Sequence, residues 1–309
     1  MKVVSVINYK GGVGKTTLTA NLGAYAASAG RRVLMIDLDP QTNLTFSFIT
    51  PEVWKERYAK NKTFKNYFDS VIKDDVLSLR KFIISLTNWE ALKLGNEKFD
   101  LISSHLELID IDTKLASKIV VGFDDVKAAT SLKAVSYLQC SLAELQNEYD
   151  IALIDCSPTF GITVKNAIFA SDYYIVPARL DYLSMLGVDR LQYNVEKFMQ
   201  ECRKNIETLG DSKYSLPNLE LLGIVPMMVN ILKGDEPVAA QREYMDAMEG
   251  KGYHLFRCVR NNGSVFGGSP EESNGLPVVL THPRFNLTAK RIVKELKELG
   301  EEFLRKVEA

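Results

Sequence analysis

The chain is poor in the residues that build redox and metal centres. It has four cysteines, at positions 140, 156, 202 and 258, and no two of them form a Cys-x-x-Cys pair. Its three histidines show no spacing typical of metal ligands. This usage argues against an iron–sulfur or zinc site and fits a reducing compartment.

The chain also lacks a strong net charge and a long apolar segment. Its formal net charge is −1, so any binding of nucleic acid must depend on a local basic surface. No apolar run approaches the length of a membrane span, and the N-terminus enters a predicted strand with no room for a signal peptide. We therefore expect a cytoplasmic protein.

Short apolar runs alternate with helix-forming segments along the 309 residues. Strands are predicted at residues 3–7, 33–36, 99–102, 151–154, 173–176, 221–225 and 254–258. Helices are predicted at residues 16–29, 106–118, 128–147, 184–208, 235–249 and from about 285. This order predicts an α/β fold with a mostly parallel β-sheet flanked by helices on both faces. We expect a single domain over 1–309, in which residues 51–97 form a helical, semi-independent insert.

A glycine-rich block lies between the first predicted strand and helix. Residues 10–17 read Lys-Gly-Gly-Val-Gly-Lys-Thr-Thr, which is typical of the phosphate-binding loop of P-loop NTPases. Tyr9 stands where the generic pattern has its first glycine, whereas the variant with a second lysine near its start fits fully. Glycines let backbone N–H groups approach an anion at the helix N-terminus. The expected nucleotide contacts are Gly11, Gly12, Val13, Gly14, Lys15, Thr16 and Thr17.

Carboxylates follow two of the predicted strands. Asp37 and Asp39 come after residues 33–36, and Asp155 ends the run 151–154. In parallel sheets, ligands gather at this edge. Asp155 has the arrangement of a Walker B aspartate, and with Asp37 and the Thr16 hydroxyl it is predicted to bind Mg²⁺. The alternative for Asp39-Pro40 is a simple turn. The loop 157–161 is placed to sense a γ-phosphate.

Two basic regions could contact nucleic acid. The first covers residues 55–65, and its alternative is a solvated helix face with the aromatic residues turned inward. The second is scattered: Lys233, Arg242, Lys251, Arg257, Arg260 and Arg284. The C-terminal helix balances its basic residues with glutamates, so we expect it to pack on the core and not on an anionic membrane.

Together these motifs resemble the ParA/Soj branch of the ParA–MinD ATPases, and the resemblance covers most of the chain. Residues 10–17 look like the deviant Walker A loop of that family. Residues 37–41 (DLDPQ) are similar to its switch I segment, and 149–158 (YDIALIDCSP) to its Walker B and switch II segment. The late family element PRN stands here as Val-Arg-Asn at 259–261, without the proline.

The resemblance implies a mechanism and partners. Two monomers would sandwich two ATP molecules with Mg²⁺. Lys10 would contact the partner's nucleotide, whereas Lys15 would reach the β- and γ-phosphates of the nucleotide in its own site. Asp39 would position the attacking water. Asp37 would be the neighbouring carboxylate that interacts with Mg²⁺ and the lysine. The ATP-bound homodimer would bind nonspecific DNA on the nucleoid, in part through Lys233 and Arg260. A ParB-like partner would stimulate slow hydrolysis and so drive plasmid or chromosome segregation.

Three other functions fit parts of the pattern. A MinD-like switch would act at the membrane in cell division, which the balanced C-terminal helix disfavours. A ParA-like ATPase could instead position a protein cargo with the same ATP chemistry. A metabolic ligase on the same fold has no obvious need for Lys10.

Overall fold

The computed structural model describes residues 1–86, 98–119, 124–210, 214–232, 236–266, 277–281, 283 and 286–309. Within these residues the strands form one sheet of eight, in the order β3-β4-β2-β5-β1-β6-β7-β8. Their bounds are β1 Lys2–Val6, β2 Val33–Asp37, β3 Ile84–Ser85, β4 Phe99–Ile102, β5 Ile151–Asp155, β6 Tyr173–Ala178, β7 Glu220–Val229 and β8 Val259–Arg260. Every pairing is parallel except that of β3 with β4.

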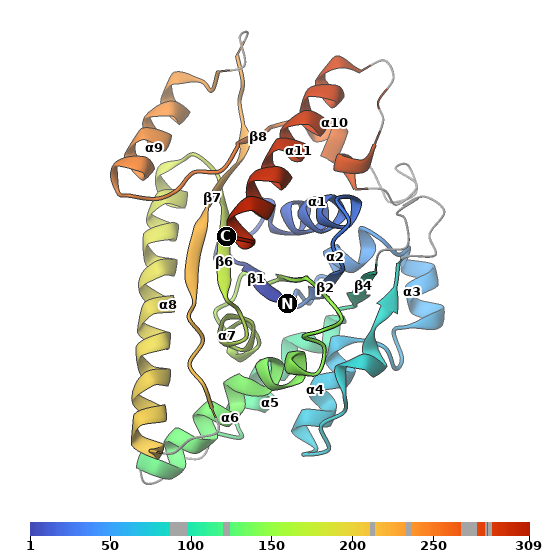
Figure 1. The fold of residues 1–309 in the computed structure, drawn as a ribbon, viewed down its shortest axis with the longest axis vertical. Coiled ribbons are helices and arrows are strands. Elements are labelled where there is room, and N and C mark those ends of the chain that lie inside the picture. The colour runs from blue at the N-terminus through green and yellow to red at the C-terminus, as the bar shows by residue number, and fades with distance from the viewer. Residues whose placement is uncertain are drawn as a thin grey trace.

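Helices connect the strands and cover both faces of the sheet (Figure 1). They are α1 Lys15–Ser28, α2 Asn43–Phe46, α3 Pro51–Arg57, α4 Phe64–Ile72, α5 Ile111–Ala116, α6 Asp124–Ala143, α7 Ile162–Phe169, α8 Tyr182–Leu209, α9 Ala239–Gly250, α10 Gly263–Phe266 and α11 Leu287–Val307. Short 3₁₀ turns lie at η1 Leu79–Phe82, η2 Leu106–Asp110 and η3 Val278–Leu280. The predicted fold class, a mostly parallel sheet between helical layers, is confirmed.

Each face of the sheet has its own apolar core. Helices α1 and α11 pack on one face, where Leu22, Leu153 and Phe303 are buried together. Helices α4 to α8 cover the other, with Ile154 and Phe198 in their cluster. Both faces of the parallel strands are therefore covered, which explains why the strands read as continuous apolar runs.

The C-terminal helix α11 packs on the core, as its balanced charge predicted. Its apolar residues Ile292, Leu296 and Leu299 are buried against the α1 side of the sheet. At Gly300 the two helices come so close that a Cβ would lie 2.3 Å from the Tyr25 ring. The helix is a structural layer of the fold.

The expectation that residues 51–97 form a semi-independent insert is wrong for the part that the structure describes. Phe64, Tyr67 and Phe68 on α4 are fully buried in the main core. The Tyr67 hydroxyl donates to the carbonyl oxygen of Tyr137 on α6 at 3.0 Å. The segment also adds β3 to the edge of the sheet. Its aromatic face is thus part of the common core; residues 87–97 lie outside the described residues.

The last strand is shorter and later than the predicted 254–258. Leu255 makes only an isolated bridge to Ile224, and β8 begins at Val259. The register shifts between Met227 and Val229, where Met228 has a positive φ of 56°. This irregularity in β7 interrupts the ladder that the apolar pattern predicted.

A candidate nucleotide-binding site at the carboxyl ends of the strands

The phosphate-binding loop connects β1 to α1. Gly12 and Gly14 have φ values of 68° and 94°, in the left-handed region that side chains disfavour. Gly14 is also the N-cap residue of α1, directly before Lys15, and it brings no side chain to the first N–H groups of that helix. The helix N-terminus is therefore open to an anion.

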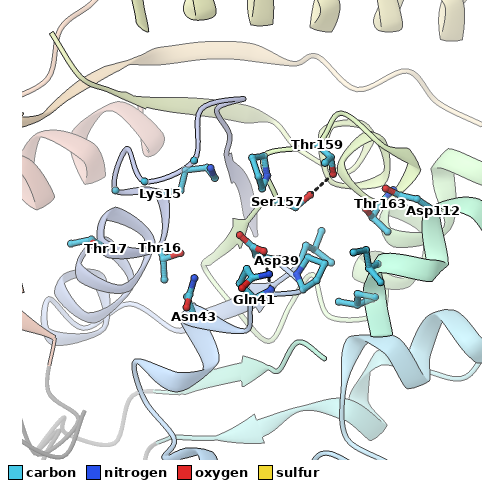
Figure 2. A pocket seen from close by; sticks show the side chains of 18 of the residues that line it. Lys15, Thr16, Thr17, Asp39, Gln41, Asn43, Asp112, Ser157, Thr159 and Thr163 are labelled. Atoms are coloured by element: carbon cyan, nitrogen blue, oxygen red, sulfur yellow. Dashed lines mark hydrogen bonds between the residues drawn. The ribbon is translucent and has the colours of Figure 1, made fainter. Parts of the chain in front are cut away.

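The loop forms one wall of a cavity of about 640 Å³, within the range of small-molecule sites. Figure 2 shows Lys15 and Thr16 on one side, Asp39 and Gln41 from the segment after β2, and Ser157 across from the loop. All but one of the predicted nucleotide contacts line the cavity; Val13 is fully buried behind it. The structure thus brings together segments from three strand ends.

Lys15 lies almost buried at the base of the loop. Its Nζ donates to the carbonyl oxygens of Asn8 at 3.2 Å and Lys10 at 3.3 Å. Burial lowers the pKa of this ammonium, and the charges of Asp155 and Asp39 oppose that shift. A phosphate in the cavity would add further negative charge beside this ammonium.

Thr16 and Asp155 lie beside Lys15, and each offers a side-chain oxygen that could bind a metal ion. The Thr16 hydroxyl donates to Oδ2 of Asp155 at 2.7 Å, and the Thr19 hydroxyl reaches Oδ1 at 3.3 Å. Asp155 is fully buried, and burial raises its pKa to about 7. A hydroxyl and a carboxylate are hard oxygen ligands of the kind Mg²⁺ prefers, and a cation would favour the ionised carboxylate. These residues fit the predicted ion.

The two aspartates after β2 have different surroundings. Asp39 lines the cavity, and its Oδ1 accepts from the Gln41 N–H at 3.0 Å. Asp37 is fully buried and does not line it; its Oδ2 accepts from the Thr45 N–H and hydroxyl at 2.8 and 2.7 Å. Burial and the nearby Asp155 raise the pKa of Asp37 well above its ordinary value. Asp37 therefore braces the segment that carries Asp39, and its contact with Mg²⁺ stays a prediction.

Lys10 points out of its own cavity. Its Nζ donates to Asp181 at 3.0 Å and to the Ser184 hydroxyl at 3.2 Å, both at the start of α8. Asp181 also caps this helix through the Ser184 N–H at 2.8 Å. The sequence contained no signal for this partner, because 171 residues separate Lys10 from Asp181.

The cavity extends beyond the predicted motifs. Leu108, Ile109 and Asp112 contribute from η2 and α5, Thr163 from α7, and Met228 from the irregular end of β7. Sequence reasoning missed Ile109, Asp112, Thr163 and Met228, since none of these four belongs to a recognisable pattern. The one available signal was Gly161, a glycine directly before a helix.

Comparison with known proteins decides the family. The AAA_31 model, described as an AAA domain, matches residues 1–208. The chain is 29% identical over 303 residues to the virulence plasmid ParA family protein pGP5-D of Chlamydia psittaci, covering 97% of this chain and 94% of that protein. It is 30% identical to the sporulation initiation inhibitor protein Soj of Bacillus subtilis, over 62% of this chain and 63% of Soj. The chain belongs to the ParA–MinD family.

Solved structures agree with this ParA–MinD fold. McdA from Cyanothece, in its apo form, superposes with a TM-score of 0.68 at 22% identity, over 98% of this chain and 99% of that one. Cobyrinic acid a,c-diamide synthase from Mycobacterium smegmatis, with bound ADP and magnesium, gives 0.65 at 22% identity, over 100% and 96%. At this identity the likeness shows the fold.

The scattered basic region of this ParA–MinD family member is paired with acids wherever the structure describes it. Arg260 is 10% exposed, and its Nε donates to Glu295 at 2.8 Å. Further pairs are Arg242–Glu236, Lys251–Asp189 and Arg257–Glu298. Lys233 and Arg284 lie outside the described residues. A DNA contact by Arg260 stays a prediction, and it would require the side chain to leave Glu295.

The first basic region follows the alternative predicted for it. Lys65 pairs with Asp69 and Glu107 at 2.8 and 3.0 Å, while the neighbouring aromatic residues Phe64 and Tyr67 are buried. This is a solvated helix face over an aromatic core. Among the described residues, no helix combines the length and apolar character needed to cross a membrane.

Proposed function

We propose that this protein is a ParA-type ATPase, built as one domain over 1–309. ATP and Mg²⁺ bind in the cavity, two ATP-bound monomers form a sandwich dimer, and the dimer binds DNA without sequence preference. Hydrolysis is slow until a ParB-like partner stimulates it, and the cycle segregates a plasmid or chromosome. Family membership, the cavity and the pairing of Thr16 with Asp155 support ATP and Mg²⁺ as its ligands.

The observation that carries this proposal is the opposite placement of the two lysines of one loop. Lys15 lies inside its own cavity and Lys10 outside it, at the start of α8. A lysine that does not face its own nucleotide site is available to the nucleotide of a second copy. There it would stabilise the charge of the transferring phosphate, as an arginine finger does.

Apolar side chains beside Lys10 support a protein contact on the same side. Tyr182, Leu183 and Leu186 follow Asp181 on α8 and are 57%, 69% and 45% exposed. Ile109, which lines the cavity, is 68% exposed. Large exposed apolar side chains that gather beside a site are typical of an interaction surface. We place the partner copy there.

Little free energy holds Lys10 in its present position. The side chains of Lys10 and Asp181 are 37% and 40% exposed, and ion pairs of such exposure contribute at most about 1 kcal/mol. The phosphates of a bound nucleotide carry more negative charge than one carboxylate. A partner's ATP can therefore compete for this ammonium.

Size-exclusion chromatography with light scattering tests the dimer. We expect the parent to be dimeric with ATP and Mg²⁺ and monomeric with ADP. Lys10→Ala should bind ATP and remain monomeric, whereas Lys15→Ala should lose nucleotide binding. Lys197→Ala, which removes an exposed lysine elsewhere on α8, is the matched control. An ATP-dependent dimer of Lys10→Ala would refute the role in trans.

Binding of a fluorescent nonspecific DNA duplex, measured across a salt series, tests the DNA step. We expect binding only with ATP, and a steep loss of affinity with salt because phosphate contacts release counterions. Lys233→Ala and Arg260→Ala should weaken binding equally for different sequences. Unchanged binding by both variants would place the DNA surface elsewhere. ATPase rates with DNA and the product of the adjacent gene test the partner.

A further inference from the structure

Helix α7 begins directly after the loop 157–161 and brings no cap of its own. Gly161 occupies the N-cap position, where serine, threonine, aspartate or asparagine would normally accept a hydrogen bond from the first turn. Without a side chain there, the first N–H groups of the helix need an acceptor from elsewhere.

Asp112 on α5 supplies that acceptor from 51 residues away in the sequence. Its Oδ1 accepts from the Thr163 N–H at 2.8 Å. Its Oδ2 lies 1.8 Å from the point where a Cβ on Gly161 would stand. The Asp112 carboxylate thus occupies the place of the missing side chain and caps α7 in its stead.

The backbone at Gly161 does not itself require glycine. Its φ of −81° and ψ of −175° are accessible to any residue. The close approach of the carboxylate is therefore what excludes a side chain. Gly161 and Asp112 therefore match each other: the carboxylate leaves no room for a side chain at position 161, and a side chain there would displace the carboxylate.

The Asp112–Gly161 pair lies at the nucleotide cavity. Asp112, Thr159 and Thr163 all line it, and Figure 2 shows Asp112 beside Thr163 on the far side from Lys15. The hydroxyls of Ser157 and Thr159 lie 3.0 Å apart within the loop. The loop thus faces the cavity at one end of α7, and its position depends on where that helix begins.

Asp112 comes from a firmly held element. Its neighbour Ile111 and Leu115 one turn later are fully buried in the core that also contains Phe68 of α4. The carboxylate can therefore fix the loop against the main body of the protein.

We infer that Asp112 is a positioning residue for ATP hydrolysis. By capping α7 it holds the loop 157–161 where a third phosphate would be met, so that the site distinguishes ATP from ADP. This inference rests on the proposed ATPase function, and Asp112 itself need not touch the nucleotide.

A set of four variants tests the inference on the full-length protein. Asp112→Ala removes the cap, and Asp112→Asn keeps an amide oxygen that can still accept from Thr163. Gly161→Ala places a Cβ against the carboxylate, and the double variant Asp112→Ala/Gly161→Ala removes that clash. Asp110→Ala is the control, because Asp110 is exposed and its side chain caps no helix. The measurements are kcat for ATP, the affinities for ATP and ADP, and the melting temperature.

For Asp112→Ala we expect kcat and the ATP-over-ADP preference each to fall roughly fivefold, as for a lost helix cap, with ADP affinity unchanged. Asp112→Asn should restore most of both. Gly161→Ala should lower kcat and the ATP-over-ADP preference when Asp112 is present. In the Asp112→Ala background it should cause no additional loss. Such non-additivity is expected if the Asp112 carboxylate and a Cβ at position 161 compete for the same space.

Other results overturn the inference. A harmless Gly161→Ala, or a double variant that shows the product of both losses, would refute the shared position. A lower melting temperature for Asp112→Ala with unchanged kcat and unchanged ATP preference would reduce Asp112 to a structural cap. If the parent binds no ATP at all, the proposed function fails as well, and the melting temperatures of the four variants still decide whether Asp112 caps α7.

Discussion

Part of the pH dependence of stability should come from the buried carboxyl group of Asp155. The perturbation is Asp155→Asn, which keeps an oxygen that can accept from the Thr16 hydroxyl but removes the titration. The parent carboxyl is fully buried, and burial raises its pKa to about 7. In the unfolded chain an aspartate titrates near pH ~4.

The sign follows from this difference. Because the folded state holds the proton more tightly, the stability associated with the protonated carboxyl is fully present below about pH 4. It is lost as the pH rises toward and through about 7. One pH unit in this window costs about 1 kcal/mol, so the parent should lose about 2 kcal/mol between pH 5 and pH 7 that Asp155→Asn does not lose.

Urea unfolding of the parent and Asp155→Asn at both pH values, without nucleotide or Mg²⁺, measures this difference. Asp246→Asn, on the exposed side of α9, controls for the substitution. Millimolar Mg²⁺ with nucleotide should then stabilise the parent more at pH 7 than at pH 5, because the ion competes with the proton. Equal pH dependence in the parent and Asp155→Asn would refute the reasoning.

Three further predictions concern Lys10 in the phosphate loop, Asp39 as the residue that positions the attacking water, and Gly300 in the core. Lys10→Ala should change the free energy of unfolding by less than about 1 kcal/mol in urea titrations, because its ion pair is half-exposed. Asp39→Ala should retain ATP as a dimer on DNA, and rapid turnover by this variant would rule out a water-positioning role. Gly300→Ala should cost about 1–3 kcal/mol, because its Cβ would meet the Tyr25 ring at 2.3 Å; unchanged stability would mean that α11 moves away freely.

The sequence predicted the parallel strands well because such strands are buried on both faces. The run at 99–102 coincides with β4, and 151–154 lies within β5. Helix boundaries were less accurate: the helix predicted at 128–147 spans Asp124–Ala143. An apolar pattern reports burial along a helix but not where tertiary contacts let the helix begin.

A similar sequence pattern misjudged residues 51–86, the part of the expected 51–97 insert that the structure describes. Charged residues dominate the surface of this segment and hide the fact that Phe64, Tyr67 and Phe68 share one buried face. Only the packing of α4 against α6 shows that the face belongs to the common core. A pattern of charges does not tell which body of the protein an amphipathic helix covers.

What the sequence by itself determined is the local chemistry of the phosphate loop. Gly12, Gly14 and Lys15 act through neighbouring backbone atoms, and a strand, a loop and a helix in succession suffice to place them. The family could be recognised from the same short motifs, and comparison with known proteins confirmed it.

Only the tertiary structure decided which distant side chains complete the site. It placed Lys10 on Asp181, left Asp37 behind the cavity, and set Asp112 in the space that Gly161 leaves. These contacts join residues far apart in the chain, so their spacing carries no periodic signal. They arise because the parallel sheet brings separate strand ends to one edge, and the helices that follow bring their first turns with them.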